Sequence, residues 1–126
     1  MKKFIGLGLF LILLNPSAFA MGRKPPIYTV DMKVDFGPAN KPGSEGPLKV
    51  EKGTTPKEAV SQVFPVLSGM SCCSLREILE IGGVRVDPAN NRWWTVSVNG
   101  STKVSPRKYK LKNGDKVVWE FIQDEQ

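Results

Sequence analysis

The stretch RWWTVSVNG, residues 92–100, has the pattern of a β-strand that ends in a tight turn. Every second residue from Trp94 to Val98 is apolar, as expected for a strand with one buried face. The following Asn99-Gly100 pair is typical of a type I′ hairpin turn, in which both central residues need a positive φ. Trp93 and Trp94 must point to opposite faces, because successive side chains alternate along a strand.

Four further segments also have strand patterns. Residues 28–36 alternate between apolar and polar side chains, and residues 48–51 repeat the pattern after a loop at 37–47 that is dense in Gly and Pro. We expect these two segments to form an antiparallel hairpin with a long connection. Residues 84–86 form a short strand, and residues 116–122 form a closing strand after a turn at 113–115.

The sequence between these strands predicts one main helix. Thr55-Pro56-Lys57-Glu58 combines a capping box with a proline at the first helical position. Five apolar residues then recur at helical spacing and should face the sheet: Ala59, Val60, Val63, Phe64 and Leu67. Pro65 should end or kink this helix, because it lacks the N–H that would bond to Ser61.

A second helix start is predicted at Ser74-Leu75-Arg76-Glu77, which is another capping box. Leu75, Ile78 and Leu79 would form its apolar side, and Gly82-Gly83 would end it. The order of elements predicts an α+β fold of the β-grasp type, with a mixed sheet of four to five strands and one main helix packed across it.

The first 20 residues have the three parts of a secretory signal peptide. Lys2 and Lys3 are the positive region, residues 4–14 are the apolar region, and Ala18-Phe19-Ala20 is a cleavage site of the small-x-small type. An apolar run of about 11 residues is too short to span a membrane, which needs about 20. We therefore expect a signal peptide at 1–20, a flexible lead at 21–26 and one domain at 27–126, exported to the periplasm or the outside and not embedded in a membrane.

Composition narrows the function further. Histidine is absent, so the commonest general base and metal ligand is missing. Removing Lys2 and Lys3 lowers the net charge from +6 to +4, and the remaining basic residues alternate with acids. A nucleic-acid surface would concentrate its basic residues on one face. We expect no nucleic-acid partner, no cofactor and no enzymatic activity.

Three segments together resemble the transcobalamin-like C-terminal domain family: residues 81–87, 92–100 and 111–121. In that family an aromatic-rich strand ends in a Val-Asn-Gly turn, and a Gly-Asp turn precedes a strand that contains a Trp. The resemblance implies a β-grasp fold. It also implies kinship with the domain that closes over the vitamin in the animal cobalamin carriers, although this sequence has no helical partner domain.

Cys72 and Cys73 are adjacent. Their Cα atoms lie about 3.8 Å apart, below the usual range of about 4.4 to 6.8 Å for a disulfide. In an oxidising compartment three states are open: a strained bond between them, which we favour, an intermolecular bridge, or two buried thiols. No metal site is expected, because two Cys without His cannot complete a tetrahedral zinc shell.

The candidate ligand-binding residues are Trp93, Arg92, Asn99 and Tyr109. If Trp94 faces the core, Trp93 points outward and can serve as a stacking platform, unless the loop at 37–47 or the segment at 106–111 covers it. No catalytic residue is predicted, since aspartates in turns usually bond local N–H groups. Two hypotheses follow: a binding module for a small ligand such as a corrinoid or a sugar, and a structural or adaptor subunit bound to another exported protein.

Overall fold

The larger of two β-sheets is the framework of the protein. The computed structural model describes residues 25–69 and 78–124. The sheet consists of four strands: β1 (Ile27–Asp35), β2 (Ser44–Glu51), β6 (Arg92–Val98) and β7 (Lys116–Gln123). The strand order is β2-β1-β7-β6. β1 pairs antiparallel with β2 and parallel with β7, and β7 pairs antiparallel with β6, so the predicted mixed sheet is confirmed.

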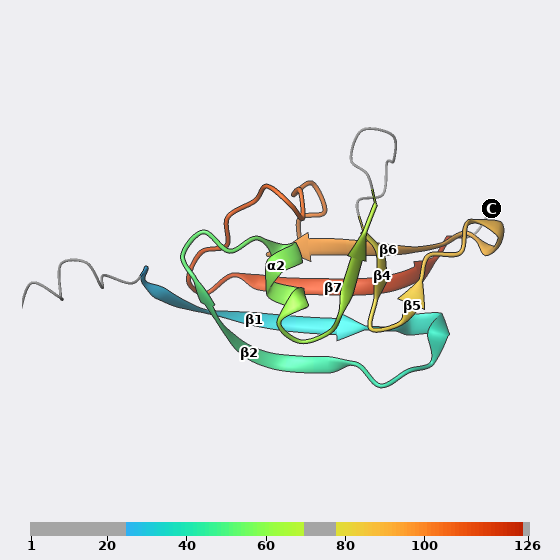
Figure 1. Cartoon of the computed structure of the whole chain (residues 1–126), viewed down its shortest axis with the longest axis horizontal. Coiled ribbons are helices and arrows are strands. Elements are labelled where there is room, and N and C mark those ends of the chain that lie inside the picture. Colours follow the sequence, from blue (N-terminus) through green and yellow to red (C-terminus); the bar gives the residue numbers. More distant parts are fainter. Residues whose placement is uncertain (1–24, 70–77, 125–126) are drawn as a thin grey trace, which may run out of the picture.

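A short helix and a second, smaller sheet complete the fold. The helix is α2 (Pro56–Ser61), and the smaller sheet contains β3 (Val66–Ser68), β4 (Ile78–Ile81) and β5 (Val84–Arg85). Within the described residues, the 3-10 helices η2 (Gly37–Ala39) and η3 (Pro88–Asn90) lie in connections. Figure 1 shows α2 and β4 crossing over the strands of the larger sheet. The fold is α+β and dominated by its sheets.

The core lies between the inner face of the larger sheet and these covering elements. Phe36 is fully buried, and its ring meets those of Phe64 and Trp94 edge to face, with centroids 5.2 and 5.4 Å away. The Trp94 Nε1 donates to the carbonyl of Val84 at 2.8 Å, which ties the larger sheet to β5. The predicted inward face of β6 is confirmed, because Trp94, Val96 and Val98 are all buried.

The start of α2 agrees with the prediction, but its extent does not. Thr55 Oγ1 accepts from the Glu58 N–H, and Glu58 accepts from the Thr55 N–H, so the capping box is formed. The helix ends at Ser61. The prediction that Val63 and Leu67 face the sheet is wrong: they are 38% and 44% exposed. Leu67 belongs to β3, because the chain turns at Pro65 into a strand that pairs with β4.

The prediction of a second helix is wrong over its described part. Ile78–Ile81 is strand β4, and residues 74–77 lie outside the described residues. Gly82-Gly83 is the two-residue turn between β4 and β5, with φ of 59° and 85°. Glycine suits a helix stop and a type I′ turn equally, and so short an apolar run does not reveal its own period.

The loop predicted at 37–47 is shorter than expected. Its first part contains η2, but β2 begins at Ser44 and continues through Pro47. Proline fits there because β2 is an edge strand. Every second N–H of an edge strand points away from the neighbouring strand, so a residue without an N–H is tolerated at such a position.

Removal of the Phe36 ring tests the core. We expect Phe36→Ala to lower the free energy of unfolding by about 3–5 kcal/mol, because it leaves a cavity between Phe64 and Trp94. The control Ile27→Ala alters a side chain that is 56% exposed and should change stability by about 0.5 kcal/mol or less. Denaturant midpoints measure both. Equal effects of the two substitutions would contradict this description of the core.

Candidate functional site

A buried carboxylate brings together two of the predicted ligand-binding residues. Asp115 is 6% exposed and lies directly before β7. Its carboxylate accepts from Asn99 Nδ2 at 2.8 Å, Tyr109 Oη at 3.0 Å and the Lys112 N–H at 2.8 Å. Asn99 also accepts from the Lys116 N–H through Oδ1 and donates its own N–H to the Lys116 carbonyl. Asn99 and Tyr109 therefore hold the β6–β7 end of the sheet together.

Asp115 and its partners Asn99, Tyr109 and Lys112 form what we call the Asp115 cluster. Their contacts shift the pKa values of Asp115 and Tyr109. Burial alone raises the pKa of Asp115, but the hydrogen bonds from Lys112, Asn99 and Tyr109 outweigh it, so the pKa lies below its ordinary value of 3.8. The pKa of Tyr109 is raised by burial and by the adjacent carboxylate, which favours the protonated phenol. Both shifts favour the state in which a neutral phenol donates its hydrogen bond to a charged carboxylate.

The other two predicted residues lie at the opposite end of β6. Trp93 is half-buried on the outer face of the larger sheet, where its cross-strand partner is Ile122. Arg92 is also half-buried, and its Nε donates to Gln123 Oε1 at 3.3 Å. The length of β6 thus separates Arg92 and Trp93 from Asn99 and Tyr109, so the four residues do not form one site. Cys72 and Cys73 lie outside the described residues.

The most distinctive hollow follows the free edge of β6, and we call it the β6 edge cleft. It has a volume of about 600 Å³. Its lining consists of residues 94–96 of β6, residues 102 and 104–106 of the following loop, Ile78 of β4, and Trp119, Glu120 and Ile122 of β7. Thr95, Glu120 and Ile122 belong to the outer face of the sheet, whereas Trp94, Val96 and Trp119 are buried on the inner face. Since both faces contribute, the cleft lies along the edge.

Trp119, which is one of the residues that line the β6 edge cleft, has a polar atom in an unusual state. Trp119 is 1% exposed, and its Nε1 is buried without a hydrogen-bond partner among the described residues. Most buried polar side-chain atoms have a partner, and leaving a donor unpaired costs about 1–3 kcal/mol. Trp94, by contrast, satisfies its own Nε1 through Val84.

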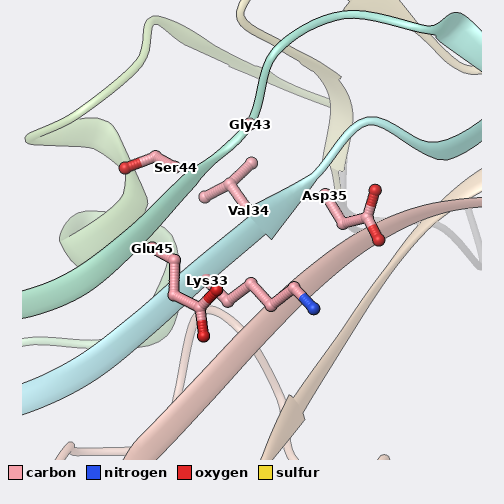
Figure 2. A pocket seen from close by; sticks show the side chains of 6 residues that line it. All are labelled: Lys33, Val34, Asp35, Gly43, Ser44 and Glu45. Carbon is pink, nitrogen blue, oxygen red and sulfur yellow. The ribbon is translucent and has the colours of Figure 1, made fainter.

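Two smaller hollows lie on the outer face of the larger sheet. Figure 2 shows the larger one, of about 340 Å³, bordered by the charged side chains of Lys33, Asp35 and Glu45. The second, of about 240 Å³, shares Lys33 and Glu45 with it. Lys33 and Glu45 are exposed to solvent. Neither hollow is lined by a buried polar side chain that lacks a partner, so neither has the unfilled bonding capacity of the β6 edge cleft.

Sequence reasoning missed the cleft because its parts come from distant segments. One signal was available: residues 101–110 have no alternating pattern after the Asn99-Gly100 turn. The turn does form, with φ of 53° and 85°, but the chain beyond it pairs with β6 only at Ser101. A strand followed by such a segment can remain open along one edge.

Comparison with known proteins supports the fold. A family model described as a domain of unknown function (DUF4430) matches residues 78–123. The crystal structure of haptocorrin in complex with Cbi is similar over 80% of this chain, with a TM-score of 0.65 and 12% identity. This chain spans 26% of that haptocorrin chain. No curated protein matches the sequence.

A second similar structure is a protein from Ruminococcus gnavus described as a candidate metal-binding protein. It matches 78% of this chain and 99% of its own, with a TM-score of 0.52 and 12% identity. Among residues 25–69 and 78–124, no group of three or more His, Cys, Asp or Glu is placed to hold a metal ion. Nor does this part of the chain contain a helix long and apolar enough to cross a membrane.

The Asp115 cluster predicts a specific dependence of stability on pH. A carboxyl group whose pKa is lowered on folding stabilises the protein above its unfolded pKa, and this contribution is lost as the pH falls through the folded value. We expect Asp115→Asn to lower the free energy of unfolding by about 1–3 kcal/mol at pH 7. The difference from the wild type should shrink as the pH falls below 3.8.

The control for this prediction is Asp31→Asn, which alters an exposed aspartate on neighbouring strand β1. It should leave both the stability at pH 7 and its pH dependence close to those of the wild type. Urea unfolding between pH 2 and 7 measures these values. A deficit for Asp115→Asn that is as large at the lowest pH as at pH 7 would contradict the lowered pKa.

Proposed function

We propose that this protein is an exported, non-enzymatic binding module of the β-grasp type, and that its ligand occupies the β6 edge cleft. The observation that carries the proposal is the hollow along the edge of β6, where one lining residue, Trp119, has a buried Nε1 without an acceptor among the described residues. Such an unpaired donor is rare in proteins and calls for an explanation. The volume of about 600 Å³ falls within the range typical of small-molecule sites.

The haptocorrin similarity supports a ligand-binding role and the resemblance to the transcobalamin-like family. Because haptocorrin was crystallised with Cbi, a corrinoid is a reasonable first ligand to test. This chain spans only about a quarter of haptocorrin, so a corrinoid held by it alone would have fewer contacts than in the larger protein. Sugars are the second class, because aromatic rings can stack on them.

A non-enzymatic role is supported by how the carboxylates are used. Asp115 accepts three hydrogen bonds within its cluster. Asp35 accepts from the Gly37 N–H, and Asp87 accepts from Asn90 Nδ2. These aspartates therefore stabilise turns and strand ends, and Asp115 accepts a local backbone N–H as the sequence predicted for an aspartate in a turn. Export is proposed from the signal-peptide pattern at 1–20, which lies outside the described residues.

The alternative, an adaptor subunit for another exported protein, is favoured by a different observation. β6 is at the edge of the larger sheet, and proteins can pair with one another through such edges. Under this alternative the same cleft would receive part of a protein instead of a small molecule.

Titration of the purified protein with corrinoids and with common sugars, followed by Trp fluorescence, tests the proposal. We expect a saturable emission change for at least one ligand, because Trp94 and Trp119 line the cleft. Val104→Arg should weaken that binding about tenfold or more by placing a long charged side chain in the cleft. Val63→Arg is the matched control, since Val63 is 38% exposed and does not line the cleft.

Two results would contradict the proposal. One is the absence of any emission change with both ligand classes and with peptides. The other is binding that Val104→Arg leaves unchanged but that Trp93→Phe removes, which would place the site at the residues predicted from the sequence instead of in the cleft. Far-UV circular dichroism checks that the variants remain folded.

A further inference from the structure

The main-chain groups of β6 identify what the β6 edge cleft can bind. In a strand, the N–H and C=O groups of successive residues point alternately to the two edges. The Asn99 N–H donates to the carbonyl of Lys116 in β7. The Asn91 carbonyl accepts from the N–H of Asp124, the residue that follows β7. The odd-numbered residues of β6 therefore bond to β7. The N–H and C=O groups of Trp94 and Val96 must point to the free edge.

Among residues 25–69 and 78–124, main-chain hydrogen bonds close this edge at both ends but not in its middle. Arg92 exchanges main-chain hydrogen bonds with Asp87 at one end, and Val98 does so with Ser101 at the other. Within the described residues, no hydrogen bond reaches the outward main-chain groups of Trp94 and Val96. Trp94 and Val96 are also two of the residues that line the cleft. The opening is thus a short segment of unpaired strand edge within a hollow.

We propose that the β6 edge cleft binds an extended peptide segment, which adds to the larger sheet as a short fifth strand beside Trp94 and Val96. The proposal rests on the proposed function, because it specifies the ligand class of the same cleft. An extended peptide presents N–H and C=O groups at the spacing that a strand edge requires, and its main chain provides affinity while side-chain pockets provide specificity. A sugar or an apolar ring has no such alternation of donors and acceptors.

The walls of the cleft restrict the side chains of the peptide. Side chains of an added strand would alternate between the two faces of the sheet. On the inner side they would meet Ile78, Val104 and Pro106. Valine or threonine fits there, because β-branched side chains pack well on a pleated surface. On the outer side lies the carboxylate of Glu120, which favours lysine or arginine.

The test uses acetylated, amidated pentapeptides with lysine at positions 2 and 4 and Val, Thr, Leu or Phe at positions 1, 3 and 5. We expect at least one to bind with a saturable change in Trp fluorescence and to lose about tenfold or more affinity with Val104→Arg but not with Val63→Arg. The decisive arm compares two N-methylated forms of the best peptide, methylated either at residues 2 and 4 or at residues 3 and 5. Only one edge of the added strand would face β6.

Strand addition therefore predicts that one methylation pattern weakens binding about tenfold or more, while the other leaves it nearly unchanged. Equal effects of the two patterns, or no binding by any peptide of the set, would overturn the proposal. If no peptide binds, but a corrinoid or a sugar binds and its affinity is weakened by Val104→Arg, strand addition is wrong and the proposed function stands. If nothing binds, both are wrong.

Discussion

The parallel pairing of β1 with β7 joins the beginning and the end of the described chain at the centre of the larger sheet. With these two strands inside, β2 and β6 must be the edges. The pairing also fixes which residues are buried, because Val30, Val34, Val117 and Trp119 then share the inner face and pack against Ala59, Val60 and Ile81 from the covering elements. Asp115 fastens one end of this arrangement by bonding Asn99 after β6 and by accepting the Asp31 N–H through its carbonyl. The position of the β6 edge cleft follows from β6 being an edge strand of the larger sheet.

The two edges of the larger sheet differ in a way that points to function. Edge strands invite unwanted pairing, and proteins usually block them with proline, charged side chains or irregular geometry. β2 follows this rule: it contains Gly46 with a φ of 152°, Pro47, and the exposed charges of Glu45 and Lys49. β6 has none of these between Trp94 and Val96, although the chain closes its ends with Asp87 and Ser101. Among the described residues, this edge is protected at both ends and unpaired in the middle, near Trp119, whose buried Nε1 has no partner there. A limited contact with a ligand would need such an arrangement. This contrast supports a binding role more strongly than the size of the hollow does.

The sequence predicted the features that depend on neighbouring residues. The capping box at Thr55 and Glu58, the turn at Asn99-Gly100 and the inward face of β6 each need only a few residues in a row, and all three are confirmed. It failed where pairing between distant segments decides the structure. Ile78–Ile81 is a strand only because Val66–Ser68 and Val84–Arg85 lie beside it. The candidate site was missed for the same reason, since Trp119 and the loop at 102–106 meet through the strand order and not through the sequence. Asn99 and Tyr109, which the sequence analysis named as ligand-binding residues, both bond to Asp115, and their role in binding stays a prediction.

Amide hydrogen exchange of the unliganded protein, resolved residue by residue along β6, tests the central claim most directly. The account predicts slow exchange at Trp93, Thr95 and Ser97, whose N–H groups bond to β7, and at Arg92 and Val98, whose N–H groups bond to Asp87 and Ser101. Within the strand, it predicts fast exchange at Trp94 and Val96 alone. A hydrogen-bonded amide exchanges only when the structure around it opens locally, whereas an unpaired amide can exchange without such opening. Protection of Trp94 and Val96 equal to that of Trp93 and Thr95 would mean that the edge of β6 is already occupied, and would contradict the account.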